Sequence, residues 1–130
     1  MKLIPLIALF TLVASGSAAA AEMAKVEGGS YRPLYLKKET SLIKVKPFQL
    51  DKYPVTNAEF AEFVNTHPQW QKGKISSKHA EKAYLKHWVK NGSNSFAPKA
   101  SELKHPVTNV SWFAANAYCV SKGKRLPTID

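Results

Sequence analysis

Cysteine is nearly absent from this chain of 130 residues, which contains only Cys119. A single cysteine excludes an intramolecular disulfide, although an oxidising compartment would permit one. The neighbouring Tyr118 and Val120 lie in a largely apolar segment, which favours a small buried core residue at this position. A reactive nucleophile or an intermolecular bridge is the alternative interpretation.

Long hydrophobic runs are also absent, since the apolar run Leu3–Val13 is too short to span a bilayer comfortably. A lysine precedes this run, and Ala19 and Ala21 supply the small residues of an A-x-A cleavage site. The pattern predicts a signal peptide over residues 1–21 and a mature protein that begins at Glu22. We therefore expect export to the periplasm or the medium, with no transmembrane anchor after cleavage. An uncleaved anchor is the alternative.

Acidic residues are few, with 9 Asp and Glu against 19 Lys and Arg and a formal net charge of +10. Removal of Lys2 with the signal peptide lowers this charge by one. The lysines are spread from Lys25 to Lys124, and only Arg32 and Arg125 could make bidentate contacts with phosphate or bases. Export argues against nucleic acid. We expect a solvated basic surface, with a specific polyanion site as the alternative.

Two extended segments are expected in the first half of the mature chain. Residues 23–36 predict a strand or hairpin punctuated by Gly28 and Gly29. Residues 42–55 alternate apolar and polar side chains, which predicts a half-buried strand whose phase shifts at Pro47.

The first predicted helix begins after Thr56, which forms a T-x-x-E capping box with Glu59. The helix should end before Pro68. Its apolar stripe at spacing i, i+3 and i+4 consists of Phe60, Phe63 and Val64.

A second helix is predicted from Ser77 to Lys90, where two rows of residues recur at a spacing of four. The row expected to face water contains Lys78, Lys82, Lys86 and Lys90. The row expected to face the core contains Ala80, Tyr84 and Trp88. Residues 91–94 should then form a loop.

The last quarter of the chain predicts an extended segment around Val107–Val110, an N-cap at Ser111 and a helix that ends at Gly123. The expected apolar stripe of this helix is Trp112, Ala115 and Cys119. Thr128 is an N-cap candidate for a further helix that would start where the sequence stops. We therefore expect this sequence to be a fragment.

No group of residues carries a recognisable chemistry. His79 and His87 lie eight positions apart in the predicted helix, whereas metal-ligand pairs on a helix use a spacing of three or four. His67 and His105 adjoin prolines, and no cluster of Cys, Asp or Glu completes a site. Nucleophile elbows and phosphate-binding loops are missing as well. We assign no catalytic, cofactor-binding or metal-binding residue.

The tetrapeptide PVTN occurs twice, at Pro54–Asn57 and at Pro106–Asn109. The first copy caps a predicted helix directly, whereas the second precedes its helix by several residues. Coincidence is favoured over a true repeat, which would need longer self-similarity.

Five strings in a fixed order carry a resemblance that extends from about Val26 to Asp130. They are GGSYRP, PFQLDKYPVTNAEFAEFV, HW, HPVTNVSWFAANAYC and GKRLPT. Together they resemble the N-terminal part of the formylglycine-generating, or sulfatase-modifying factor, family. Residues 22–130 would then be the N-terminal portion of such a domain.

The resemblance implies an α+β fold of the C-type-lectin-like type, incomplete at its C-terminus. Members of this family oxidise a cysteine of a target protein with copper and oxygen, and relatives use non-haem iron in sulfur transfer or act in periplasmic maturation. Their catalytic cysteines, metal ligands and calcium-binding residues follow the RLPT segment, so none can be placed on this chain.

Two departures from the family pattern are visible. The helix after NVSW usually carries an early acidic residue, whereas Phe113 and Ala114 stand here, so Ser111 lacks a reciprocal capping partner. The opening GGSYRPLY replaces the usual GG-x-F-x-M-G pattern, which indicates a divergent subgroup. Cys119 resembles the structural cysteine of that helix.

Three functional hypotheses follow from the sequence. The first is the front half of an exported oxidoreductase that acts on a protein cysteine or a related substrate. The second is a non-catalytic binding or maturation module whose candidate surface consists of the Lys-rich segment with Trp70, Tyr84 and Trp88. The third is a non-functional remnant that would aggregate through an uncovered apolar face.

Overall fold

The computed structural model describes residues 22–35 and 41–128. The predicted signal peptide and the helix expected after Thr128 lie outside these residues. The elements in chain order are β1 (Met23–Val26), β2 (Gly29–Tyr31), β3 (Ile43–Val45), β4 (Phe48–Asp51), α1 (Asn57–Thr66), the 3-10 turn η1 (Pro68–Trp70), β5 (Val89–Lys90), β6 (Phe96–Ala97), the 3-10 turn η2 (Ala100–Glu102) and α2 (Trp112–Ser121).

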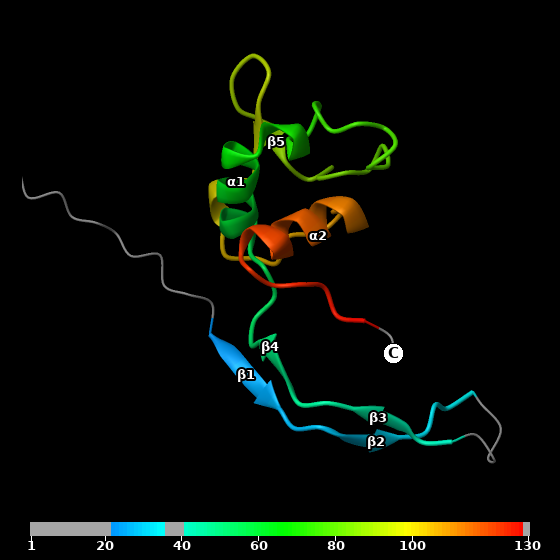
Figure 1. Ribbon diagram of the computed structural model, residues 1–130. Coiled ribbons are helices and arrows are strands. Elements are labelled where there is room, and N and C mark those ends of the chain that lie inside the picture. The colour runs from blue at the N-terminus through cyan, green and yellow to red at the C-terminus, as the bar shows by residue number, and fades with distance from the viewer. Residues whose placement is uncertain (1–21, 36–40, 129–130) are drawn as a thin grey trace, which may run out of the picture.

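The first four strands form an arm that projects from the helical part of the molecule (Figure 1). β1 pairs antiparallel with β4, and β2 pairs antiparallel with β3, so the two pairs follow one another along a single bent hairpin. The bend lies at Gly28, where a Cβ atom would come within 2.8 Å of the Pro47 ring. The expected phase shift at Pro47 therefore coincides with a break in both ladders.

The burial expected for residues 42–55 holds for only part of that segment. In β3 the side chains of Ile43 and Val45 are half-buried and Lys44 is exposed, as the alternation predicts. In β4, by contrast, Phe48 and Leu50 are exposed. The half-buried strand is wrong for β4, because no other described element packs against that face.

Helix α1 has the boundaries and the buried face that its sequence predicts. The Thr56 side chain accepts a hydrogen bond from the Glu59 backbone, and the Glu59 carboxylate accepts one from the Thr56 backbone at 2.8 Å. His67 ends the helix before Pro68. The apolar stripe enters the core, whose buried residues are Phe60, Phe63, Val64, Tyr84, Leu85, Trp88, Ala114 and Tyr118.

The predicted helix from Ser77 to Lys90 is wrong, because this segment consists of successive turns followed by β5. Leu85 adopts a left-handed backbone with φ of 46°, and its N–H donates to the carbonyl of Asn109 at 2.8 Å. A residue in that conformation cannot continue a right-handed helix. The lysine repulsion expected at a spacing of four also disfavours the helix.

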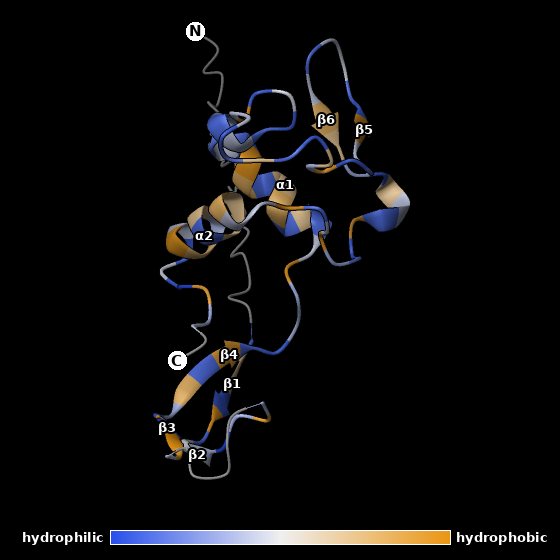
Figure 2. Cartoon of the chain, turned by 90° about the vertical axis from the view of Figure 1, so that its right-hand side faces the viewer, coloured by the Kyte–Doolittle hydropathy of each residue, from blue (hydrophilic) through white to orange (hydrophobic). Residues whose placement is uncertain are grey.

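Burial within this segment nevertheless follows the predicted rows. Tyr84 and Trp88 are buried, and all four lysines of the other row are exposed. The loop expected at residues 91–94 connects β5 to β6. This hairpin lies at the opposite end of the molecule from the arm (Figure 2).

Helix α2 begins and ends as its sequence predicts. The Ser111 side chain accepts from the N–H of Ala114, and the first turn contains no acidic residue. At the other end Gly123 has φ of +67°, and the N–H of Lys124 donates to the carbonyl of Cys119 at 2.8 Å. This is a Schellman motif, in which glycine relieves the cost of the left-handed residue.

The apolar stripe predicted for α2 is wrong. Ala114 and Tyr118 face the core, whereas Trp112 is 64% exposed and Cys119 is only partly buried. The aromatic rings of α1 select the buried face, since Tyr118 lies 5.8 Å from the Phe60 ring and 5.5 Å from the Phe63 ring.

The two PVTN copies lie side by side. Thr56 forms an antiparallel bridge with Pro106, and the N–H of Val107 donates to the carbonyl of Val55 at 2.9 Å. The copies thus pair with each other at the N-terminus of α1. None of the helices in residues 22–35 and 41–128 has the length and apolar content required to cross a membrane.

Candidate functional site

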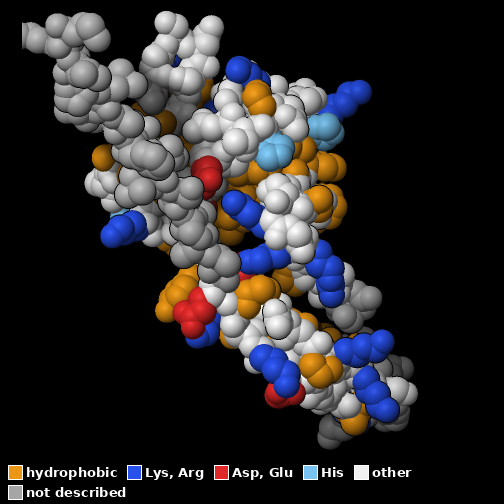
Figure 3. Space-filling view, turned by 60° about the vertical axis from the view of Figure 1, so that its left-hand side comes forward, with side chains coloured by type: hydrophobic (Ala, Val, Ile, Leu, Met, Phe, Trp, Pro, Cys, Tyr) orange, Lys and Arg blue, Asp and Glu red, His pale blue; other side chains and the backbone are white. Residues whose placement is uncertain are grey.

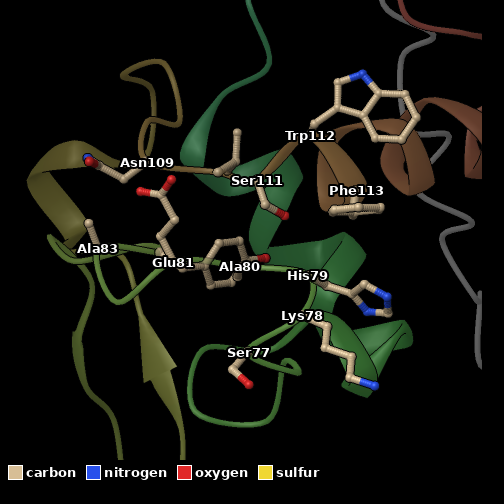
Figure 4. Close-up of a pocket in the computed structure, with 12 residues that line it drawn as sticks. Ser77, Lys78, His79, Ala80, Glu81, Ala83, Asn109, Ser111, Trp112 and Phe113 are labelled. Carbon is tan, nitrogen blue, oxygen red and sulfur yellow. The ribbon is translucent and has the colours of Figure 1, made fainter.

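A cavity of about 470 Å³ opens between the turns that precede β5 and the N-terminal end of α2. Figure 4 shows side chains of both segments around it. The residues that line it are Ser77, Lys78, His79, Ala80, Glu81, Ala83, Tyr84, Asn109, Val110, Ser111, Trp112 and Phe113. Its volume lies in the range of small-molecule binding pockets.

Four rings form a continuous row, which we name the aromatic row; three of them, His79, Phe113 and Trp112, line this cavity, and Trp70 extends the row beyond it. The centroids of Trp70 and His79 are 5.9 Å apart, those of His79 and Phe113 are 5.0 Å apart, and those of Phe113 and Trp112 are 5.5 Å apart. His79 and Phe113 lie next to each other in Figure 4. These spacings are typical of favourable aromatic pairs.

The polar lining has no excess charge of one sign. Lys78 and Glu81 carry opposite charges, and Ser77, Ser111 and Asn109 add neutral groups. The Ser111 hydroxyl oxygen already accepts from Ala114 at 3.2 Å, so its hydrogen is available for donation. Together with the aromatic row, these groups could bind a ligand that has both an apolar face and hydrogen-bonding groups.

Tyr84 connects the cavity to the core. Its hydroxyl donates to the backbone carbonyl of Trp70 at 2.8 Å, which fixes the start of the aromatic row. Burial raises the pKa of the Tyr84 hydroxyl well above its usual range, so this group is a hydrogen-bond donor at neutral pH and cannot serve as a base.

One of the residues that line the cavity, Asn109, and its buried neighbour Leu85 both have a left-handed backbone. Leu85 has φ of 46° and Asn109 has φ of 54°, and the two are joined by the backbone hydrogen bond described above. Left-handed asparagine is common, but a fully buried left-handed leucine carries a conformational cost that its surroundings must offset.

The two histidines that the sequence placed on one helix have different environments. His79 belongs to the aromatic row. Nε2 of His87 instead lies 3.1 Å from Oδ1 of Asn57, and Nδ1 of His87 is buried without a hydrogen-bond partner. The structure does not bring the two rings to a common site.

The donor set of the described chain does not fit the copper or iron that the family resemblance implies. Within residues 22–35 and 41–128, no three His, Cys, Asp or Glu side chains are grouped so that they could hold a metal ion. Cys119 is partly buried, and burial and then Asp51 raise the pKa of its thiol against the opposing effect of Lys124. A raised pKa disfavours the thiolate that binds metal.

The binding surface suggested by the sequence is right for its lysines, which are exposed, and wrong for two of its three aromatic residues. Tyr84 and Trp88 belong to the core, and only Trp70 remains partly exposed. Sequence reasoning missed Trp112 and Phe113 as cavity residues, because it counted Trp112 in the buried stripe of α2. Their position directly after the N-cap, where side chains can avoid the core, was the available signal.

Comparison with known proteins adds family membership to this geometry. A family model described as the sulfatase-modifying factor enzyme 1-like domain matches residues 10–130. The inactive C-alpha-formylglycine-generating enzyme 2 of Bos taurus is 30% identical in an alignment 109 positions long, which covers 66% of this chain and 36% of that protein. The formylglycine-generating enzyme of Bos taurus is 32% identical in an alignment of the same length, 109 positions, which covers 66% of this chain and 29% of that protein.

A bacterial relative is similar over a comparable share of the chain. Hercynine oxygenase of Mycolicibacterium smegmatis is 30% identical in an alignment 95 positions long, which covers 67% of this chain and 22% of that enzyme. The chain thus spans about a third or less of the curated relatives that it matches here. Since the family model covers nearly the whole sequence, the chain belongs to the sulfatase-modifying factor enzyme 1-like family.

Proposed function

We propose that this chain is the N-terminal part of an exported protein of the formylglycine-generating type. In its whole form this protein would be a metal-dependent oxidoreductase that acts on a protein cysteine or a related substrate. The observation that carries the proposal is the family match over residues 10–130 in a chain that spans only 29% of a relative named formylglycine-generating enzyme.

The surface of α2 supports this proposal. Trp112 is 64% exposed and Val120 is 63% exposed, although both are large apolar residues. Phe48, Leu50 and Tyr53 at the end of the arm are exposed as well. Large exposed apolar side chains in this number are a reason to expect that another part of the protein covers them. Further polypeptide of a C-type-lectin-like domain would cover them.

The catalytic chemistry would come from residues that this chain does not supply. Copper or non-haem iron, and calcium, would be held by that further polypeptide, since the described donors do not form a metal site. The 130 residues would then act as a scaffold, with α1 and α2 forming the packed base. Localisation in the periplasm or outside the cell rests on the signal-peptide pattern of residues 1–21.

The test compares this chain with the full product of its gene. Each protein is incubated with copper, oxygen and a reporter polypeptide containing a single cysteine, and aldehyde formation is followed by mass spectrometry. We expect conversion by the full product and none by the 130-residue chain. Conversion by the short chain would contradict the scaffold role, and inactivity of the full product with either copper or iron would contradict the oxidoreductase proposal.

A second candidate function is a non-catalytic binding or maturation module. It is favoured by the similarity to a relative named inactive and by the aromatic row beside the cavity. The discriminating variant is Trp112→Ala, with Trp70→Ala as a second probe of the same row. A module of this kind should bind glycans or envelope components saturably and lose that binding in both variants, whereas an unchanged affinity would argue against it.

A further inference from the structure

A second cavity, of about 410 Å³, lies between the turn after η1 and the β5–β6 hairpin. It is separate from the cavity beside α2, since the two share no lining residue. The residues that line it are Gly73, Lys74, Lys90, Ser93, Asn94, Ser95 and Phe96. Figure 2 shows that the loop joining β5 to β6 is largely hydrophilic.

The charge of this lining has one sign. Lys74 and Lys90 are both exposed. Neither takes part in any of the ion pairs among the described residues. No Asp or Glu lines the cavity. Two cations around one concavity without a compensating anion attract a negative ligand.

Lys72 has a different role and helps to hold the cavity open. Its Nζ donates to the backbone carbonyls of Trp88 at 2.8 Å and Lys86 at 3.3 Å, and it lies 4.6 Å from the centre of the Phe96 ring. These contacts join the turn after η1 to the segment just before β5 and to β6. Lys72 is therefore engaged in contacts within the protein, whereas Lys74, two residues later, is available to bind a ligand.

Neutral donors complete the lining on the hairpin side. The backbone N–H of Asn91 donates to the carbonyl of Ser95 at 2.9 Å, and Gly92 adopts φ of +85°, so the turn is closed by its own backbone. This places Ser93 and Asn94 at the rim, where a hydroxyl and an amide can donate to an anion. The Ser95 hydroxyl is already used, since it donates to the carbonyl of Asn91.

We propose that this cavity binds a phosphate group through Lys74 and Lys90, with Ser93 and Asn94 as neutral donors. Ammonium groups and hydroxyl or amide donors around one oxyanion form charge-assisted hydrogen bonds, which are stronger than neutral ones. The volume exceeds that of a single oxyanion, so the phosphate can be free or part of a larger molecule such as a lipid headgroup. The inference does not depend on the proposed oxidoreductase role.

The test measures binding of two probes by the purified chain. Inorganic phosphate is titrated into ¹⁵N-labelled protein while the amide signals of Gly73, Ser93 and Asn94 are followed by NMR. Phosphatidylglycerol vesicles are used in a separate co-sedimentation assay. The test protein is a double variant that carries both Lys74→Gln and Lys90→Gln. The control is a double variant of the arm, Lys44→Gln and Lys46→Gln, which removes the same charge from two exposed lysines.

In the unmodified chain we expect saturable chemical-shift changes confined to the amides of Gly73, Ser93 and Asn94. The test variant should bind with an affinity about tenfold or more lower, because two charge-assisted hydrogen bonds are lost. The control should retain the affinity. Binding of phosphate alone identifies a soluble ligand, and variant-sensitive binding of vesicles identifies a headgroup. The proposal is overturned by equal losses in test and control, or by no binding of either probe. Asn94→Ala, which leaves both charges in place, should weaken binding less.

Discussion

Oδ1 of Asn57 accepts a hydrogen bond from Nε1 of Trp88 at 3.0 Å, in the interior of the helical part. The same oxygen lies 3.1 Å from Nε2 of His87, and Nδ2 of Asn57 donates to the carbonyls of Glu102 at 3.0 Å and His105 at 3.3 Å. A single amide that is 2% exposed therefore joins α1 to the segment before β5 and to the turn after η2.

Substitution of Asn57 with alanine should lower the free energy of unfolding by about 3 kcal/mol, because it leaves several buried polar groups without partners. The measurement is urea denaturation followed by tryptophan fluorescence. Asn65→Ala is the matched control, since Asn65 is an exposed residue of the same helix and should cost within about 0.5 kcal/mol. Equal effects of the two substitutions would refute the central role of Asn57.

The two helix caps should differ in strength. The Thr56 hydroxyl accepts from the backbone N–H of Glu59 and donates to the Glu59 carboxylate at 2.7 Å, and the Thr56 backbone N–H donates to the same carboxylate. Ser111 makes only the bond to Ala114. Thr56→Ala should therefore cost about 2 kcal/mol and Ser111→Ala about 1 kcal/mol in chemical denaturation. Equal or reversed costs would show that the bond from the Thr56 hydroxyl to the Glu59 carboxylate contributes nothing.

The stability of the chain should fall at alkaline pH. Burial, and then the negative charges of Glu59 and Asp51, raise the pKa of the Tyr118 hydroxyl from 10.0 to about 12. The unfolded tyrosine loses its proton near the lower value and the folded one near the upper value. The contribution of Tyr118 to the free energy of unfolding is therefore fully present below pH 10 and is lost as the pH rises toward 12.

Tyr118→Phe provides the check, because it keeps the ring that packs on Phe60 and Phe63 and removes the ionisable group. The free energy of unfolding is compared at about pH 8 and about pH 11. The decrease should be smaller in the variant but still present, since Tyr84 also has a pKa raised by burial. An unchanged decrease would exclude Tyr118 as a source.

The left-handed backbone of Asn109 predicts opposite outcomes for two substitutions. Asn109→Gly should change stability by less than about 0.5 kcal/mol, since glycine adopts φ of 54° without steric cost. Asn109→Val should destabilise by about 2 kcal/mol, because a β-branched side chain is strained there. Thermal unfolding of both variants measures this difference, and similar melting temperatures would contradict the assigned conformation.

Local patterns in the sequence determined the two helices and their ends. The capping box at Thr56, the N-cap at Ser111 and the glycine at Gly123 each act within one turn of chain, so neighbouring residues suffice to predict them. The motif order likewise indicated the family that the family model identifies. These features depend on residues close in sequence or on strings that can be compared directly.

Tertiary contacts decided what local patterns could not. The segment from Ser77 to Lys90 has a helical period, yet the bond from Leu85 to Asn109 and the bonds around Asn57 hold it in turns. The face of α2 that is buried depends on the rings of α1. The cavity beside the aromatic row, and the second cavity that both Lys74 and Lys90 line, arise only when distant segments fold together. Sequence periodicity gives the direction of a side chain relative to its own element, but only the packed structure determines which element it meets.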